Sequence, residues 1–153
     1  MKITKAIFLF LLINFGGLAI GSWLMDGGAT SLWYTTLNQA PWTPPGIVFG
    51  IAWTTIMVLF SIYLGILFQD ENTKKNKILY GIQIILNVSW NFLFFNQHLV
   101  LLALINILFL TAIVFYFFFK GSKKTTKIKY LLLPYMIWLC IATSLNLYIL
   151  IHN

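Results

Sequence analysis

Residues 33–53 read WYTTLNQAPWTPPGIVFGIAW and contain three tryptophans, three prolines and two glycines, but no basic residue. The paired prolines Pro44 and Pro45 disfavour helix in the residues just before them. Gly46 then begins a strongly apolar run. We expect this stretch to end an ordered cap, residues 26–45, and to lead directly into a membrane helix.

The composition of the chain points to a membrane protein. Of its 153 residues, 60% are hydrophobic and 8% are charged, whereas a soluble domain has about 45–50% apolar and about 25% charged residues. A membrane span needs about 20 mostly apolar residues. The sequence therefore predicts an all-α integral membrane bundle, one domain over residues 1–153, with five transmembrane helices at about 6–25, 46–68, 78–96, 99–119 and 130–151. Cys140, the single cysteine, lies in an apolar run and is predicted to be an inert buried side chain.

The basic residues predict the orientation of these spans. All ten are lysines, and they lie before the first span, between the second and third, and between the fourth and fifth. Five spans place all ten on one side, so the positive-inside bias predicts a cytoplasmic N-terminus, with the first loop and the C-terminus external. We interpret the net charge of +7 as a rim near anionic lipid headgroups rather than a nucleic-acid surface. The first apolar segment could also be a secretory signal, but its length favours a retained span.

The spans carry amides in place of charges. Ionisable groups inside spans mark proton relays and ion paths, and their absence from the span interiors argues against an ion-coupled transporter. Gln83, Asn87 and Asn91 recur every four residues and should share one helix face. Because an unpaired amide is costly in hydrocarbon, these side chains should point into the bundle. Further amides occur in the other helices, at Asn14, Asn106 and Asn146.

Two tryptophans are predicted to lie too deep for an interfacial belt. Trp53 falls in the external half, about 10 Å below the outer end of its span, and Trp138 lies nearer the middle. Trp138, Ala142 and Asn146 follow an i, i+4, i+8 spacing and share one face. Aromatic walls with a few polar anchors are typical of pockets for flat organic ligands. Two alternatives stay open, because amides also join membrane helices and tryptophans also form interfacial belts. Gly17 and Gly21 could likewise serve either internal packing or a homodimer.

Three blocks of sequence resemble the TspO/MBR family, the tryptophan-rich sensory proteins related to the translocator protein (peripheral-type benzodiazepine receptor). They are W-Y-x-x-L with W-x-P-P-G-x-V-F-G-x-x-W in 33–53, L-N-x-x-W-x-x-L-F-F in 86–95, and P-Y-x-x-W-x-x-x-A-T-x-L-N in 134–146. The resemblance implies a five-helix bundle, commonly dimeric, whose pocket is closed by the first loop. Family ligands include porphyrins and haem, benzodiazepine-type drugs and, in animals, cholesterol. By position, the resemblance implies that Tyr34, Trp53, Asn87, Trp138, Ala142 and Asn146 line or support the pocket; the polar layer adds Asn91. Where the family often has Lys-Pro, this chain has Gln39 and Ala40, so the cap lacks a cation for a porphyrin propionate.

The expected function is a membrane sensor or regulator that binds a tetrapyrrole. It could support light-dependent porphyrin degradation, with Trp53 and Trp138 as the reactive indoles; no conventional acid, base or metal site is expected, and no cofactor is required. The alternatives are a non-catalytic carrier of porphyrins or lipids, and a scaffold whose lysine-rich loops recruit a cytoplasmic partner. The expected partners are a porphyrin or another flat aromatic ligand, membrane lipid and a second copy of the chain, but no nucleic acid.

Overall fold

The computed structural model describes residues 2–120 and 125–153. Within these ranges five helices are long and apolar enough to cross a membrane, and no strand occurs, so the predicted all-α membrane bundle is confirmed. The five helices are α1 (Ile3–Leu24), α3 (Gly46–Asp70), α4 (Lys74–Asn91), α5 (Val100–Phe119) and α6 (Leu133–His152). Shorter helices are η1 (Gly28–Thr30), α2 (Leu32–Thr36), η2 (Phe92–Asn96), η3 (Thr125–Lys127) and η4 (Lys129–Leu132).

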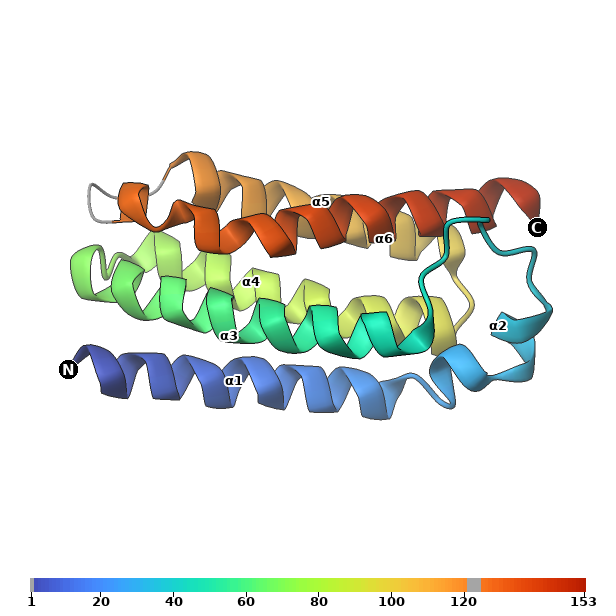
Figure 1. The fold of residues 1–153 in the computed structure, drawn as a ribbon, viewed down its shortest axis with the longest axis horizontal. Coiled ribbons are helices and arrows are strands. Elements are labelled where there is room, and N and C mark those ends of the chain that lie inside the picture. Colours follow the sequence, from blue (N-terminus) through green and yellow to red (C-terminus); the bar gives the residue numbers. More distant parts are fainter. Residues whose placement is uncertain (1, 121–124) are drawn as a thin grey trace.

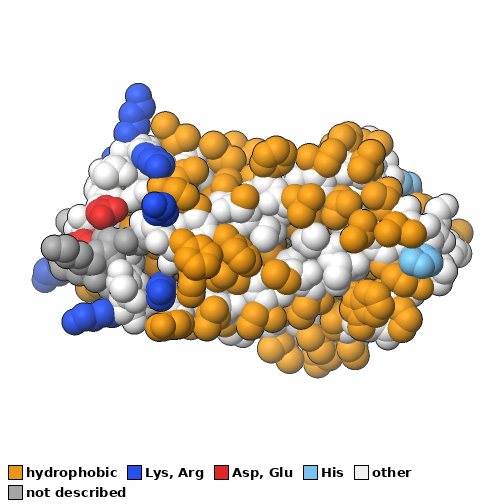
Figure 2. Space-filling model, turned by 90° about the horizontal axis from the view of Figure 1, so that it is seen from above, with side chains coloured by type: hydrophobic (Ala, Val, Ile, Leu, Met, Phe, Trp, Pro, Cys, Tyr) orange, Lys and Arg blue, Asp and Glu red, His pale blue; other side chains and the backbone are white. Residues whose placement is uncertain are grey.

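The long helices run side by side, and the two chain termini lie at opposite ends of the bundle (Figure 1). We call one end the lysine end, because lysine side chains gather there (Figure 2). We call the other the cap end, because it carries α2, the connection from α2 to α3, and the C-terminus (Figure 1). Two of the lysines used in the orientation argument, Lys123 and Lys124, lie outside the described residues.

Local sequence explains how several helices begin and end. α1 ends where Asp26, Gly27 and Gly28 adopt three successive left-handed conformations, with φ of 49°, 87° and 51°, a region that glycine enters without steric cost. Thr73 caps α4 by accepting a hydrogen bond from the Asn76 backbone N–H, at 3.1 Å. The last turn of that helix widens into a π-helix, η2, a feature that is frequent at functional sites.

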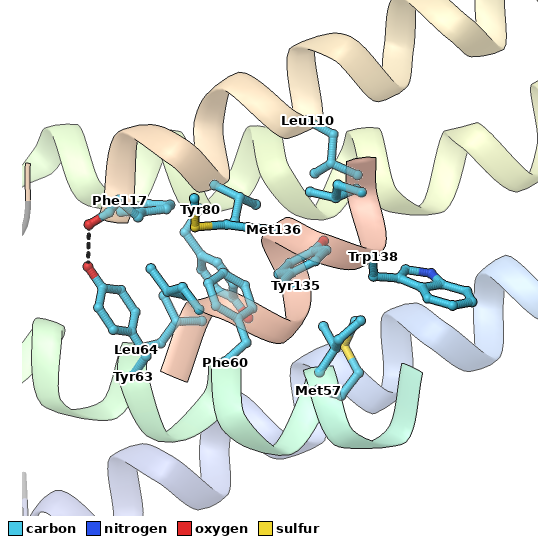
Figure 3. Close-up of a cluster of buried hydrophobic side chains, with 14 of the residues drawn as sticks. Met57, Phe60, Tyr63, Leu64, Tyr80, Leu110, Phe117, Tyr135, Met136 and Trp138 are labelled. Atoms are coloured by element: carbon cyan, nitrogen blue, oxygen red, sulfur yellow. Dashed lines mark hydrogen bonds between the residues drawn. The ribbon is translucent and has the colours of Figure 1, made fainter. Parts of the chain in front are cut away.

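The lysine-end half of the bundle has a dense aromatic core, in which Phe60, Tyr63 and Tyr135 are almost fully buried (Figure 3). The Tyr63 hydroxyl donates to the Phe117 carbonyl at 2.8 Å (Figure 3). Hydrogen bonds also join the polar side chains of this half. The bonds are Asn14 Nδ2 to Ser61 Oγ at 2.8 Å, Tyr80 Oη to Asn14 Oδ1 at 2.9 Å, and Gln83 Nε2 to Tyr135 Oη at 2.8 Å. These bonds tie α1, α3, α4 and α6 together, as expected where lipid offers buried polar groups no other partner.

Glycines allow α1 to approach its neighbours closely. Gly17 and Gly21 face α4: a Cβ at Gly21 would stand 2.6 Å from Asn91 Nδ2. The pair is therefore used for packing within the chain. Gly65 on α3 makes the tightest contact, because a Cβ there would stand 3.2 Å from the backbone of Ile7.

The prediction that Cys140 is buried is wrong. This side chain is exposed on the surface of α6, since the rotation of the helix turns it away from the core although the local sequence is apolar on all sides.

Candidate functional site

A chamber of about 410 Å³ occupies the cap-end half of the bundle. This volume lies in the range of small-molecule sites, roughly 300–1,000 Å³. Its lining comes from the end of α1, from the cap, and from α3, α4, η2, α5 and α6. The lining residues are Met25, Ala29, Thr30, Tyr34, Gln39, Thr43, Pro44, Gly46, Phe49, Trp53, Asn87, Trp90, Asn91, Phe95, Ile107, Leu110, Trp138, Leu139 and Ala142. The floor is formed where Leu110, Trp138 and Leu139 join the packed core.

Residues 26–45 form the roof of this chamber. Ser31 caps α2 by accepting a hydrogen bond from the Tyr34 backbone N–H, at 3.3 Å. Further along, Gln39 Nε2 donates to the Tyr34 carbonyl at 3.0 Å. These local bonds hold Tyr34 and Gln39 in the lining. The segment expected to form the cap thus contains a short helix followed by a hydrogen-bonded turn.

Contacts on two sides fasten the cap to the bundle. On one side, Trp33 stacks on His98, with ring centroids 4.0 Å apart and planes at 13°. On the other side, Trp42 Nε1 donates to Ser144 Oγ at 3.1 Å. Close to this second attachment, the Asn38 backbone N–H donates to Asn153 Oδ1 at 2.8 Å. The roof is thus held by the α4–α5 turn and by the C-terminal part of α6.

Aromatic rings form much of the chamber wall. Trp53 and Trp138 meet edge to face, with centroids 6.5 Å apart and planes at 76°. Phe49 meets Trp138 in the same way at 5.1 Å. Trp90 lies against Phe95 with centroids 5.8 Å apart. Such edge-to-face contacts are favourable and fix the rings relative to one another.

The amides of α4 divide between the two halves of the bundle. Gln83 is paired with Tyr135 in the packed core, whereas Asn87 and Asn91 line the chamber. Asn146 is the exception among the predicted lining residues: it is buried behind the wall. Its Oδ1 accepts from Trp90 Nε1 at 3.1 Å, and its Nδ2 donates to the Val100 carbonyl at 3.0 Å. Asn146 therefore positions Trp90 and does not line the chamber.

The lining is uncharged. It contains no Asp, Glu, Lys, Arg or His among the residues that the structure describes. Burial raises the pKa of the Tyr34 phenol above its ordinary value, so this hydroxyl stays protonated at neutral pH. Within residues 2–120 and 125–153 no group of three or more His, Cys, Asp or Glu side chains could hold a metal ion. The site can therefore stack, bury and hydrogen-bond a ligand, but these side chains supply no acid–base pair for conventional catalysis.

A smaller cavity of about 260 Å³ adjoins the chamber on the side of α1. It shares Met25, Phe49, Trp53, Asn87 and Asn91 with the chamber. Its wall also includes Gly50 and Thr54, which line a shallow groove on the exposed face of α3. A second cavity thus lies between the chamber wall and the exposed face of α3.

Sequence reasoning found part of this site. Tyr34, Trp53, Asn87, Asn91, Trp138 and Ala142 lie together in the lining. The main residue that it missed is Trp90, which the second sequence block contains but which we did not select as a site residue. A spacing signal was available, because Trp90 follows Asn87 by three residues and can lie on the same side of the helix.

The fold and the site define a class: a polytopic membrane protein with an aromatic, uncharged ligand chamber under an extramembrane cap. The TspO/MBR family model matches residues 8–152, and this chain belongs to that family. A tryptophan-rich protein TspO of Archaeoglobus fulgidus is 30% identical, in an alignment covering 100% of this chain and 97% of the relative. A tryptophan-rich sensory protein of Cereibacter sphaeroides is 33% identical over 74% of this chain and 72% of its own. The protein CrtK of Rhodobacter capsulatus is 29% identical over 74% of each chain.

Proposed function

We propose that this membrane protein is a sensor or regulator that binds a tetrapyrrole, either a porphyrin or haem, in the chamber at the cap end. The observation that carries the proposal is the make-up of the lining, in which Trp53, Trp90 and Trp138 surround one uncharged space. A tetrapyrrole is flat and aromatic, and indole rings pack well against such a surface. Asn87 and Asn91 offer amides that can orient the ligand by hydrogen bonds.

The test is a titration of the detergent-purified protein with protoporphyrin IX in the dark, followed by tryptophan fluorescence. We expect saturable quenching that falls when Trp138 is replaced by phenylalanine. Trp23→Phe is the matched control, because Trp23 is 81% exposed and lies outside the chamber. Quenching that fails to saturate, or that depends on Trp23 rather than Trp138, would count against the proposal.

Light-dependent breakdown of the bound porphyrin is a second candidate function. It is favoured by the indoles of Trp53 and Trp138, which line the same chamber and whose ring centroids are 6.5 Å apart. An illuminated porphyrin can activate dioxygen, and the adjacent indoles can donate electrons or be oxidised themselves. The double variant Trp53→Phe, Trp138→Phe should retain dark binding but lose most of the protein-dependent fading of the porphyrin spectrum. Undiminished fading in that variant would contradict this chemistry.

A carrier of porphyrins or lipids is a third candidate, and the adjoining cavity, which shares Gly50 and Thr54 with the exposed groove of α3, favours it. Such a carrier would speed the transfer of porphyrin out of liposomes. Transfer at the rate of protein-free liposomes would exclude it.

We further propose that the lysine end faces the cytoplasm and that the cap and the C-terminus are external. The support is the segregation of lysine side chains at one end of the bundle (Figure 2). Cysteines introduced at Asn38 and, separately, at Lys74, both in a Cys140→Ser background, would test this orientation by labelling intact cells with a membrane-impermeant reagent. We expect the variant at position 38 to be labelled and the variant at position 74 to be protected.

We also propose a homodimer whose interface lies away from the Gly17 and Gly21 face, which α4 already covers.

A further inference from the structure

We propose that the chamber selects flat ligands whose inserted part is uncharged, and that Gln39 sets this selectivity. The inference rests on the proposed function, since it specifies which tetrapyrroles the same site would accept. Natural porphyrins commonly carry carboxylate arms, so charged and uncharged porphyrins are distinct ligands that a site can tell apart. Three observations lead to it.

The first observation is the absence of any cation from the lining. Across the described residues, neither the chamber nor the adjoining cavity is lined by a Lys, Arg or His side chain. The polar groups that they do present are hydroxyls and amides, such as Thr54, Asn87 and Asn91. These groups can hydrogen-bond a neutral oxygen or nitrogen of a ligand. They cannot compensate a buried carboxylate, which needs an opposite charge to offset its lost hydration.

The second observation is the distance to the basic residues. The sequence has no lysine between Lys5 and Lys74, and none between Lys77 and Lys120. On α4, Lys77 precedes Asn87 by ten residues, which corresponds to about 15 Å along the helix. Figure 2 shows the lysines gathered at the end of the bundle opposite the histidines. Of the lysines that the structure describes, none can therefore reach a carboxylate inside the chamber.

The third observation is the negative charge of Asp26, an acidic residue next to the lining in the sequence. Asp26 directly follows Met25, a residue that lines both cavities, and its side chain is exposed at the cap end. A carboxylate entering beneath the cap would meet this like charge, which adds repulsion to the loss of hydration. An ester, amide or alkyl substituent meets neither penalty. The electrostatics at the cap end thus disfavour anionic ligands over neutral ones of the same shape.

Gln39 is the position at which this selectivity can be changed. It lies in the roof, it lines the chamber, and its Nε2 donates to the carbonyl of Tyr34. A lysine has a similar length, can donate to the same carbonyl, and would bring a positive charge to the lining. Gln97 provides a matched control, because it is an exposed glutamine at the same end and does not line the chamber. The variants Gln39→Lys and Gln97→Lys have the same net charge and differ in where that charge lies.

The experiment compares dark binding of protoporphyrin IX and of its dimethyl ester to the parent protein and to both variants. The two ligands share one ring system and differ in the charge of their arms. Because the ester also partitions more strongly into detergent, the decisive quantity is the ester-to-acid ratio of dissociation constants, compared among the three proteins under one detergent condition. The partition of each ligand into detergent is the same for all three proteins, so it cancels when their ratios are compared.

Unpaired burial of the carboxylates should make the parent favour the ester over the free acid. Relative to the parent, Gln39→Lys should shift the ratio at least about fivefold toward the acid, and Gln97→Lys should leave it unchanged. A Gln39→Lys ratio equal to that of the parent would overturn the inference alone and leave the proposed function standing. An equal shift in both lysine variants would also overturn it, because net charge would then explain the effect. Failure of the parent to bind either ligand would overturn the proposed function and this inference with it.

Discussion

The lysine-end half of the bundle is packed solid and the cap-end half is hollow, although the same five long helices build both. In the solid half, polar side chains are paired with one another, as in the Asn14, Ser61 and Tyr80 group. In the hollow half, Asn87 and Asn91 line an open space and large aromatic rings form its walls. The same residue type thus serves two purposes: amides such as Asn14 stabilise the bundle through their hydrogen-bond partners, whereas the Asn87 side chain faces the chamber without one among the described residues. Asn91 is intermediate, because it lines the chamber while its Nδ2 donates to the Asn87 carbonyl at 3.4 Å.

The largest loss of stability is expected from Gly65→Leu in the solid half. A side chain at this position meets the backbone of Ile7, which cannot move aside without separating α1 from α3. We expect a loss of about 3 kcal/mol in the free energy of unfolding, the upper part of the usual overpacking range. Reversible unfolding in detergent micelles would measure it. Gly81→Leu is the control, since no atom lies within 4 Å of a Cβ there, and its effect should stay below about 0.5 kcal/mol.

Asn14→Leu should be the next most damaging change. It removes the acceptor of the Tyr80 hydroxyl and the donor to Ser61, and both partners are buried. Leaving such groups unpaired costs roughly 1–3 kcal/mol, and we expect about 2 kcal/mol from the same unfolding measurement. Gln97→Leu, at an exposed turn, serves as the comparison. Equal stabilities of the two variants would show that the solid half does not depend on its polar pairs.

Asn87→Leu should weaken ligand binding and leave the stability of the bundle almost unchanged. The Asn87 side chain lines the chamber and makes no hydrogen bond within the described parts of the chain. We therefore expect the stability to change by less than about 0.5 kcal/mol. Binding of protoporphyrin IX dimethyl ester should weaken by about five- to tenfold, which corresponds to about 1 kcal/mol for one lost hydrogen bond. A large loss of stability with unchanged binding would mean that Asn87 is structural.

His98→Ala should have the smallest effect, on the cap alone. It removes the ring on which Trp33 stacks, and an aromatic contact of this kind contributes about 0.5–1.5 kcal/mol. We expect the dissociation rate of bound porphyrin ester to rise about threefold, with no change in the unfolding of the bundle. His152→Ala compares the other side of the cap, because His152 stacks on Tyr148, whose ring meets Trp42. A dissociation rate equal to that of the parent in His98→Ala would show that the Trp33 stack does not hold the roof.

The architecture could be predicted from the sequence because lipid imposes simple rules on length and charge. Apolar runs of about 20 residues predicted five helices, and five helices long and apolar enough to cross a membrane are present in the described chain. Depth along a helix could be estimated from the rise per residue. This estimate predicted that Trp53 and Trp138 border the same internal space. The cap was expected to be ordered because Pro44 and Pro45 restrict the backbone.

Cys140 was predicted to be buried from the apolar residues around it and is exposed. The face shared by Trp138, Ala142 and Asn146 could have corrected this, because Cys140 lies about 200° around the helix from Trp138. That face alone could not give the partners of Asn146, whose side chain bonds Trp90 and the backbone of Val100 rather than lining the chamber. Close approaches such as Gly65 against Ile7 join residues far apart in the sequence, so no local pattern indicates them.

Filling the chamber with a larger side chain tests whether the hollow half is the ligand site. Ala142 lines the chamber from α6, whereas Ala112 is exposed on α5. We would titrate Ala142→Phe, Ala112→Phe and the parent with protoporphyrin IX dimethyl ester in the dark and measure each dissociation constant. The account predicts that Ala142→Phe weakens binding at least about tenfold while Ala112→Phe binds as the parent does. Parent-like binding by a correctly folded Ala142→Phe variant would contradict it.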